Sequence, residues 1–554
     1  SRAEELPNEK LWVRFLVRME EVTDRIAAGE TAAQIVEKAK AEGTGYKASV
    51  EQMYYGNQQF LFVYEQFDDV RLVAAPPSSI GKFGGDTDNW IWPRHTGDFS
   101  MFRVYASKDN RPAAYSPQNV PYRPKKHFSI STKGVKEGDF TMIYGFPGNT
   151  QEYILSDAVA YIAERSDPAK IAVRTGRLDI ITKAQESDPA LRIHYAAKHA
   201  SIANAWKKWQ GEALGIDRRG TVAAKFDYET QFGLWSVGRP EYAGVVMGLR
   251  AEYDRIMDAY FAYEITRETL STLPAAYTPE ERAEECFARR KFAEQALWRH
   301  AFREYGRCPK VYRTPSYAEG MARYKSPEAY ADALFEAVWE GSDSVAMQPA
   351  VRLREETKRM LDHISWMLGT KSLRNLNSKI LNELYTTYIK GLREWDRERA
   401  FYPDANLTLR VAYGSVAGYE YADGEYHKPQ TTLDGIIAKD NPEIYDYDIP
   451  QSLRDLYASK NYGRWGTVID GRRTVPVCFL ATNHTTGGNS GSPVLNAGGE
   501  LIGINFDRTW RSTMSDIAFD PAICRNIAVD IRYVLFVVDR VGGAGYLLKE
   551  MTLK

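Results

Sequence analysis

Thr485-Thr486-Gly487-Gly488-Asn489-Ser490-Gly491-Ser492-Pro493-Val494 is a glycine-rich turn between two apolar stretches, residues 475–480 and 501–506. A serine that attacks a carbonyl needs an exposed Oγ on a tight turn, beside backbone N–H groups that can hold the developing oxyanion. Gly488, Asn489 and Ser490 offer that geometry. For Gly-x-Ser-Gly alone, a hairpin loop is the better interpretation. The longer pattern, from a strand through Gly-Asn-Ser-Gly-Ser-Pro-Val to Gly-Glu-Leu-Ile-Gly-Ile, is much rarer and makes Ser490 a candidate nucleophile.

The bulk composition limits the classes of function. A chain of 554 residues is too long for one hydrophobic core, so two or three domains are expected. Net charge is −1, which gives no case for nucleic acid or an anionic membrane as a partner. Composition is that of a globular protein, at 44% hydrophobic, with no apolar run long enough to span a bilayer. The 35 tyrosines and 12 tryptophans favour recognition of an organic ligand in a cleft, although large cores also use them.

The four cysteines are Cys286, Cys308, Cys478 and Cys524. None belongs to a CxxC pair, so we expect neither a zinc site nor thiol catalysis. Either two disulfides or four buried thiols would fit this set. Cys478 and Cys524 both lie in the second β region and could meet. The first residue is Ser1 with no apolar signal segment before it, so we expect any targeting signal to have been removed.

Along the first 151 residues the pattern is mostly that of strands. Residues 1–45 have helical periodicity, with Thr31 as a helix cap before Ile35. Residues 59–65 and 69–75 are predicted to be neighbouring strands joined by a short acidic turn. Residues 84–97 are too rich in Gly, Asp and Trp for a strand, 98–105 alternate again, and 136–149 indicate a hairpin.

Residues 152–400 have a helical pattern, with Thr278-Pro279 and Ser326-Pro327 as helix starts. Alternation returns at 406–413 and persists to 526–533, and 535–548 resemble a closing helix weakened by a Gly-Gly pair. The predicted organisation is therefore a β region, an inserted α region and a second β region, with the two β regions in one domain.

Three stretches carry a resemblance to a known family: residues 86–100 (Asp-Thr-Asp-Asn-Trp-Ile-Trp-Pro-Arg-His-Thr-Gly-Asp-Phe-Ser), residues 204–209 (Asn-Ala-Trp-Lys-Lys-Trp), and residues 487–493 with Phe-Asp-Arg at 506–508. Together they resemble serine peptidase family 46 of the chymotrypsin-like clan, the bacterial dipeptidyl-peptidases 7 and 11. The resemblance covers essentially the whole chain. It implies a β-plus-α fold: a chymotrypsin-like double β-barrel catalytic domain (1–151 and 401–554) with a large inserted α-helical cap domain (152–400).

The resemblance also assigns roles to residues. It implies Ser490 as the nucleophile, Asp98 as the aspartate that orients a histidine, and the N–H groups of Gly488 and Ser490 as the oxyanion hole. Asn89, Trp90, Asn204 and Asp507 match residues that hold the free α-amino group of a substrate and close the cleft beyond two residues. Taken alone, Asp98 is better interpreted as a loop carboxylate, Asn89 as a turn residue and Trp90 as a core indole.

Arg508 separates the two branches of the family. Its position matches the floor of the S1 pocket, where the branch with broad, hydrophobic specificity has glycine and the Asp/Glu-specific branch has arginine. A planar guanidinium suits the carboxylate of an acidic P1 residue. Without such a partner it would be an unpaired buried charge, so we expect it to reject apolar P1 residues. A solvent-facing arginine after a strand is the alternative.

One part of the family pattern is missing from the printed sequence. The family places its catalytic histidine in an N-terminal Thr-Asn-His-His-Cys-type motif, and no such motif occurs here. His95 is only three residues from Asp98, and His484 leads into the serine's own loop, so both are expected to be structural. We expect the segment with the catalytic histidine to lie outside residues 1–554.

The sequence thus predicts a serine exopeptidase that releases N-terminal dipeptides with Asp or Glu at P1. The alternatives are a relative with broad or hydrophobic P1 preference, or a catalytically silent peptide-binding relative. Expected partners are peptides with a free amino terminus, with no nucleic acid, no membrane span, no metal and no cofactor. By resemblance, we also expect a homodimer in the periplasm or at the surface of a Gram-negative bacterium.

Overall fold

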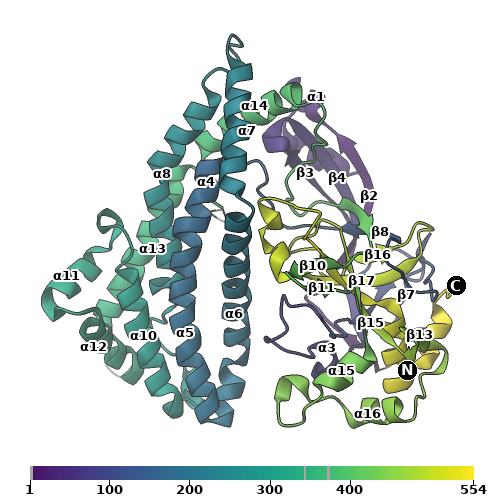
Figure 1. Cartoon of the computed structure of the whole chain (residues 1–554). Coiled ribbons are helices and arrows are strands. Elements are labelled where there is room, and N and C mark those ends of the chain that lie inside the picture. Colours follow the sequence, from purple (N-terminus) through teal and green to yellow (C-terminus); the bar gives the residue numbers. More distant parts are fainter. Residues whose placement is uncertain (1–3, 342–344, 371–372, 374) are drawn as a thin grey trace. The chain divides into compact units, whose positions relative to one another are not determined.

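The computed structural model describes residues 4–341, 345–370, 373 and 375–554, which form two compact units (Figure 1). One unit is discontinuous: it combines the described residues up to Tyr153 with Ala400–Lys554. The other unit is the segment Ile154–Arg399, which consists of helices and their connections.

The discontinuous unit is built from antiparallel strands. They are β1 (Leu6–Pro7), β2 (Val13–Glu21), β3 (Tyr46–Met53), β4 (Gln58–Phe67), β5 (Asp69–Ala74), β6 (Met101–Ala106), β7 (Val120–Pro121), β8 (Phe140–Gly145), β9 (Arg410–Ser415), β10 (Tyr419–Ala422), β11 (Glu425–His427), β12 (Gln430–Thr432), β13 (Thr467–Ile469), β14 (Arg472–Thr474), β15 (Pro476–Ala481), β16 (Pro493–Leu495), β17 (Leu501–Arg508) and β18 (Asn526–Asp530). Short helices join them: α1 (Thr23–Ala27), α2 (Ala32–Lys40), α3 (Ser78–Gly81), α15 (Leu433–Lys439), α16 (Gln451–Ala458) and α17 (Ile531–Phe536).

The largest sheet unites residues from both ends of the chain. Its strand order is β12-β15-β18-β17-β16-β8-β9. Strand β8 precedes the helical insertion, yet Ile143 pairs with Val494 of β16 on one side and with Ala412 of β9 on the other. Every residue of β15 is buried, which makes this sheet the centre of the unit. This sheet therefore joins strands from both β regions of the sequence.

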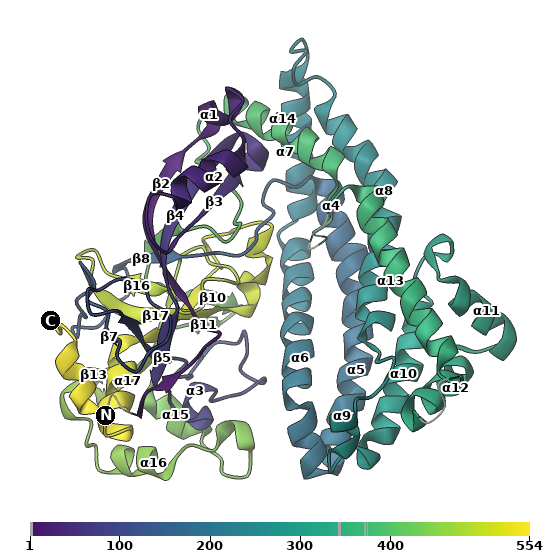
Figure 2. The same ribbon diagram turned by 180° about the vertical axis from the view of Figure 1, so that it is seen from behind.

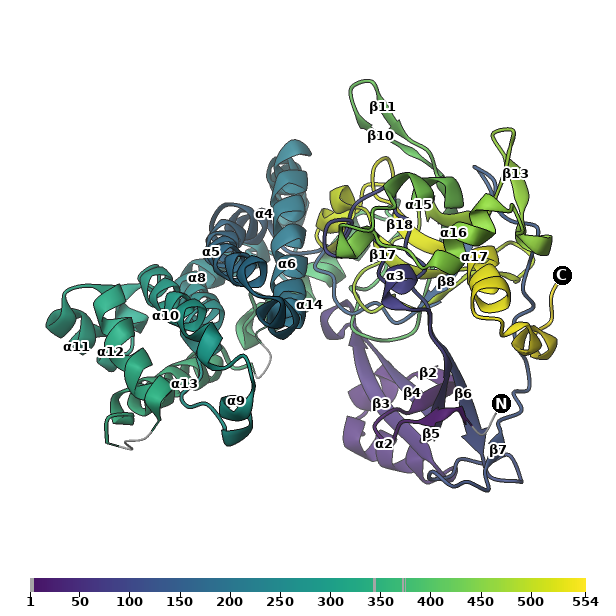
Figure 3. The same cartoon turned by 90° about the horizontal axis from the view of Figure 1, so that it is seen from below.

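The predicted double β-barrel is not confirmed. In the part of the chain that the structure describes, the strands form five sheets, each with two edges: the seven-stranded sheet, β1-β5-β6-β7, β2-β4-β3 and the hairpins β10-β11 and β13-β14. The β10-β11 hairpin extends from the body of its unit in Figure 3. The coarser prediction, a mixed fold of antiparallel sheet and inserted helices, is correct.

The prediction of a helix over the N-terminal residues is wrong for 13–21. These residues form β2, which pairs with β4 along its whole length. Apolar residues occupy every second position from Val13 to Met19, as in a strand, but Leu16 interrupts this alternation and the register shifts beside it. The expected helix begins later, at α2, where Thr31 and Gln34 form a capping box. Figure 2 shows α2 lying on β3 and β4.

Two further strand predictions need correction. Residues 59–65 and 69–75 are strands as predicted, β4 and β5, but they belong to different sheets. Strand β4 pairs with β2 and β3, whereas β5 pairs with β1 and β6, so the short turn at Asp68 passes the chain from one sheet to the next. Residues 136–149 do not form a hairpin, because the strand within them, β8, takes both partners from the C-terminal part of the chain.

The helical unit contains α4 (Ser156–Ala160), a π-helical turn (Tyr161–Ser166), α5 (Asp167–Ser187), α6 (Pro189–Arg218), α7 (Thr221–Ser236), α8 (Val245–Glu268), α9 (Pro279–Ala283), α10 (Lys291–Tyr305), α11 (Pro315–Tyr324), α12 (Pro327–Glu340), α13 (Gln348–Leu368) and α14 (Lys379–Trp395). Both predicted helix starts are confirmed. Thr278 forms a capping box with Glu281, and the Ser326 hydroxyl accepts from the backbone N–H of Ala329. Buried side chains of α5, α6 and α10 pack together, among them Ile181, Tyr195 and Leu297.

The C-terminal segment is helical only in part. Helix α17 continues into a π-helical turn (Val537–Val541). The helix ends at Gly542-Gly543, and a 3-10 segment (Gly545–Glu550) follows. All four cysteines are buried free thiols, so the expectation of four buried thiols is confirmed and that of two disulfides is not. Among the described helices, none has the length and apolar character that crossing a membrane requires.

Candidate active site

Ser490 lies at the tip of the loop between β15 and β16, and its side chain is exposed. Two asparagines fix the loop around it. The Asn489 side chain accepts from the N–H of Thr486 at 3.0 Å, and the Asn505 side chain on β17 donates to the Asn489 carbonyl at 3.1 Å. Asn505 is itself held by Asn526 of β18, at 3.0 Å. Side chains of the central strands β17 and β18 therefore hold the loop in place. Asn505 is a site residue that the sequence pattern did not predict.

The backbone N–H groups of the loop divide into two sets. Those of Asn489, Gly491 and Ser492 donate to carbonyls within the loop or on β17. Those of Gly488 and Ser490 have no acceptor among the described residues. Gly488 has φ +107°, a conformation that favours glycine, which turns its peptide group relative to its neighbours. Two unspent N–H groups beside an exposed serine hydroxyl are the donors that an oxyanion requires.

The segment after β8 packs against this loop. The N–H of Gly148 donates to the Gly487 carbonyl at 2.6 Å, and the Thr486 hydroxyl donates to the Asn149 carbonyl at 3.4 Å. A Cβ on Gly488 would overlap the Phe146 carbonyl oxygen and would lie 2.8 Å from the Gly148 nitrogen. The Gly-Phe-Pro-Gly stretch at 145–148 thus forms one wall of the nucleophile loop.

Asp507 is at the centre of a second cluster, at the end of β17. Its Oδ2 accepts from Arg94 Nη1 at 2.6 Å and from the Trp90 backbone N–H at 3.3 Å, and its Oδ1 accepts from the Arg508 N–H at 2.8 Å. Trp90 has φ +66°, so the chain turns sharply where its N–H faces the carboxylate. Arg94, buried and paired with Asp507, was not singled out from the sequence because it lies in a loop of no regular pattern.

Asn89 precedes Trp90 in this turn and is half-buried. Asn204 is exposed on α6 of the helical unit.

Asp98 is exposed just before β6. Neighbouring protein atoms displace water from its carboxyl and raise its pKa; the negative charge of Asp507 raises this pKa too, whereas Arg94 lowers it. Asp98 is thus electrostatically linked to the Asp507 cluster. The Ser490 hydroxyl donates to the carbonyl of Phe506, the residue before Asp507, at 3.4 Å.

The histidines of the discontinuous unit have other partners. His484 Nε2 bonds the Ser515 carbonyl at 2.9 Å, and the ring stacks on Phe519, while burial lowers its pKa to about 4. His95 is buried, which lowers its pKa to about 3. His127 bonds Thr552, and His427 bonds Tyr419 and Glu425. No hydrogen bond joins any of these four histidines to Ser490 among the described residues.

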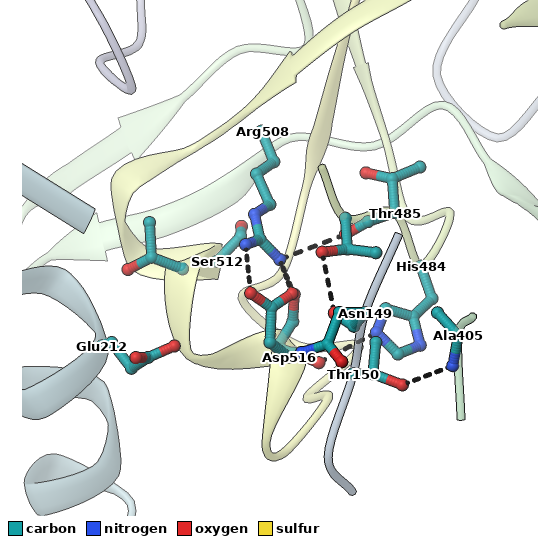
Figure 4. A network of polar contacts seen from close by, with 12 residues as sticks. Asn149, Thr150, Glu212, Ala405, His484, Thr485, Arg508, Ser512 and Asp516 are labelled. Atoms are coloured by element: carbon teal, nitrogen blue, oxygen red, sulfur yellow. Dashed lines mark hydrogen bonds and ion pairs between the residues drawn. The ribbon is translucent and has the colours of Figure 1, made fainter. Parts of the chain in front are cut away.

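Arg508 is the last residue of β17 and is 4% exposed. Its Nη1 donates to the Thr485 carbonyl in the nucleophile loop at 3.2 Å, so the guanidinium lies beside that loop. Its fork also faces Asp516, as Figure 4 shows. The expectation of an uncompensated positive charge is therefore wrong for the structure as it stands.

One group of side chains in the helical unit has the composition of a metal site. Ligand atoms of His194, Glu284 and Cys286 lie within 4.8 Å of one another. Arg290 already occupies this group, since its Nη1 is 2.7 Å from His194 Nε2 and 3.2 Å from Glu284 Oε2. A resident guanidinium repels a cation, so we assign no metal there.

An exposed serine on a glycine turn, beside two backbone N–H groups with no acceptor among the described residues, fits the nucleophile of a serine peptidase. The family model of peptidase S46 matches residues 1–291 and 280–553. The chain belongs to the peptidase S46 family.

Relatives and solved structures agree on this family. The Asp/Glu-specific dipeptidyl-peptidase of Capnocytophaga gingivalis is 42% identical, with 100% of this chain and 85% of the relative covered. Dipeptidyl-peptidase 7 of Phocaeicola vulgatus is 34% identical, with 100% and 84% covered. The crystal structure of Porphyromonas endodontalis DPP11 in complex with the dipeptide Arg-Glu has a TM-score of 0.85 at 33% identity and covers 100% of this chain and 87% of that one.

Proposed function

We propose that this protein is a serine dipeptidyl-peptidase that removes dipeptides from the amino terminus of peptides and prefers Asp or Glu at P1. The observation that carries this proposal is Arg508, buried at the end of β17 and bonded to the loop that holds Ser490. Similarity to the Asp/Glu-specific enzymes supports it, as does the solved relative with Arg-Glu.

In the proposed reaction, Ser490 Oγ attacks the carbonyl of the P1 residue. The Gly488 and Ser490 N–H groups then stabilise the oxyanion, and they are already oriented because Asn489 and Asn505 hold the loop. Asp98 orients the histidine that removes the serine proton, and the family pattern assigns that histidine to a motif that residues 1–554 lack. The Asp98 pKa, which is raised without this partner, would fall when a histidine cation faces it.

To release a dipeptide, the enzyme must cleave after the second residue of the substrate. This requires a group that binds the α-amino group at a fixed distance from the nucleophile. We assign this role to Asp507, with Asn89 and Trp90 beside it; resemblance to the family adds Asn204 to this set. Asp507 is oriented by Arg94 and by two backbone N–H groups. A carboxylate fixed in this way offers its remaining lone pairs to an ammonium group at a set distance from Ser490.

The test is hydrolysis of fluorogenic dipeptides with Asp or Leu at P1, each with a free or an acetylated amino terminus, by the full-length gene product. We expect the free-amine Asp substrate to be cleaved faster than the free-amine Leu substrate, and neither acetylated substrate to be cleaved. Ser490→Ala should lower kcat by roughly 10⁴-fold or more. Arg508→Gly should move preference from Asp toward Leu. Equal cleavage of acetylated substrates would refute the amine anchor, and no cleavage by the wild type would favour a silent peptide-binding protein.

The finer architecture and the cellular setting also belong to the proposal. We propose that the seven-stranded sheet with the nucleophile loop corresponds to one barrel of a chymotrypsin-like pair. We further propose a homodimer in the periplasm or at the cell surface, by resemblance to the family. Light scattering coupled to gel filtration tests the dimer, and fractionation of the source cells tests the location.

A further inference from the structure

The Arg508 guanidinium already has a negatively charged partner in the structure. Its Nη1 and Nη2 bond the two carboxylate oxygens of Asp516 at 2.6 and 2.8 Å, in a bidentate pair. The side chains are 5% and 13% exposed, so water screens this pair poorly. The proposed S1 floor therefore carries a compensated charge in the structure. The sequence motif predicted the positive charge of Arg508 but not its pairing with Asp516.

Asp516 is fixed in this place. It ends a 3-10 segment (Trp510–Asp516) whose preceding residue, Ser515, also contacts Arg508: the Ser515 hydroxyl accepts from Nη1 at 2.8 Å. The Asp516 carbonyl accepts from the Gln151 N–H at 2.6 Å, and the Ser515 carbonyl is bonded to His484. The C-terminal end of this segment, which carries the carboxylate, is thus anchored at two successive residues, and Figure 4 shows Asp516 directly opposite the guanidinium fork.

We infer that Asp516 is a specificity-determining residue that limits the preference for acidic P1 residues. The inference rests on the proposed function. An acidic P1 side chain must share one guanidinium with a resident carboxylate, and two negative groups on one site repel each other. An apolar P1 side chain, in contrast, leaves Arg508 compensated by Asp516 and is not penalised by a buried unpaired charge.

Removal of the resident charge should change the two classes of substrate in opposite directions. In Asp516→Asn the shape is kept, and kcat/KM for Glu or Asp at P1 should rise about 10-fold, as expected for removal of a like charge a few ångströms away. For Leu at P1, kcat/KM should stay level or fall, because Arg508 is then uncompensated. The ratio of acidic to apolar cleavage is the measured quantity.

Asp440→Asn is the matched control, because it removes one carboxylate from another bidentate pair of the same unit. Asp440 bonds Arg454 Nε and Nη2 at 2.7 and 2.8 Å. It should leave the acidic-to-apolar ratio at the wild-type value. In an Arg508→Gly background, Asp516→Asn should no longer raise the ratio, since its effect acts through the guanidinium.

The outcomes separate the inference from the proposed function. If Arg508→Gly leaves the ratio unchanged, the proposed S1 assignment fails. If Arg508→Gly lowers the ratio but Asp516→Asn leaves it unchanged or lowers it, the inference about Asp516 is overturned.

A crystal structure keeps the inference testable even where Asp516→Asn does not fold. In a Ser490→Ala crystal with a dipeptide that ends in Glu, both carboxylates should lie within about 4 Å of the Arg508 guanidinium. A P1 carboxylate on Arg508 with Asp516 displaced would overturn the inference, and a P1 carboxylate elsewhere would overturn the S1 assignment.

Discussion

Replacing Gly488 by alanine should damage catalysis far more than the loss of one hydrogen atom suggests. At φ +107° an alanine is strained by about 1–3 kcal/mol. The added Cβ would also overlap the Phe146 carbonyl oxygen and press on the Gly148 nitrogen at 2.8 Å, and both are backbone atoms that cannot rotate away. The peptide of Gly488 must therefore turn, which moves its N–H from the oxyanion.

The expected effect on rate follows from the loss of one oxyanion donor. We expect kcat to fall by about 10²- to 10³-fold, equivalent to about 3–4 kcal/mol, with KM nearly unchanged because the donor acts in the transition state. Steady-state hydrolysis of the free-amine Asp substrate measures both constants. Thermal unfolding of the same samples measures the strain, expected at about 1–3 kcal/mol.

Two neighbouring glycines are the controls. A Cβ added at Gly487 would have no neighbour within 4 Å, and the residue has no positive φ, so Gly487→Ala should match the wild type in stability within about 0.5 kcal/mol. Gly491 has φ +82° but open space, so Gly491→Ala should show strain without the collision. If Gly488→Ala keeps its kcat within about 3-fold of wild type while its stability falls, the assigned oxyanion role is wrong.

Three other predictions concern stability. Gly233→Ala, in open space within α7, should raise stability by about 0.5–1 kcal/mol, whereas Gly176→Ala in α5 should lower it, because its Cβ would overlap the buried His300 ring; thermal unfolding compares them. His484 and His95 have folded pKa values of about 4 and about 3, below the unfolded value of 6.5, so the unfolded chain binds more protons and stability should fall as pH drops from 6.5 toward 4. The fall should be shallower in His484→Gln, and equal slopes would contradict this. The four buried thiols should react with a thiol reagent only after unfolding, and fewer than four reactive thiols would indicate a disulfide.

The sequence predicted best where the signal is local. The helix caps predicted at Thr31 and Thr278 depend on only a few residues each, and both exist in the structure. It failed at residues 13–21, where several apolar side chains in a short window fit both a helix and a strand, and the decision depends on β4, about 45 residues away. The division of the strands into five open sheets could not be predicted either, because strand partners depend on residues far apart in the sequence.

The candidate site shows the same division. Ser490 and Arg508 follow from a motif, but what compensates Arg508 could not be read from the sequence. Asp516 is an ordinary acidic residue in a Ser-Asp pair, and it becomes significant only because the 3-10 segment folds back over the strand end. Arg94 and Asn505 were missed for the same reason: each acts through a partner that is distant in the sequence.

The insertion of the helical unit has a consequence for how the chain folds. Its two ends meet on one helix: Lys225 of α7 bonds the Ile154 carbonyl at 3.1 Å, and Tyr228 of α7 bonds Asp396 at 2.8 Å. Closing a flexible loop of about 250 residues costs about 5 kcal/mol in chain entropy. A helical unit that folds first, through contacts local in sequence, already brings these ends together. Strand β8 can then pair with β9 at little further entropic cost, although the two strands lie far apart along the chain.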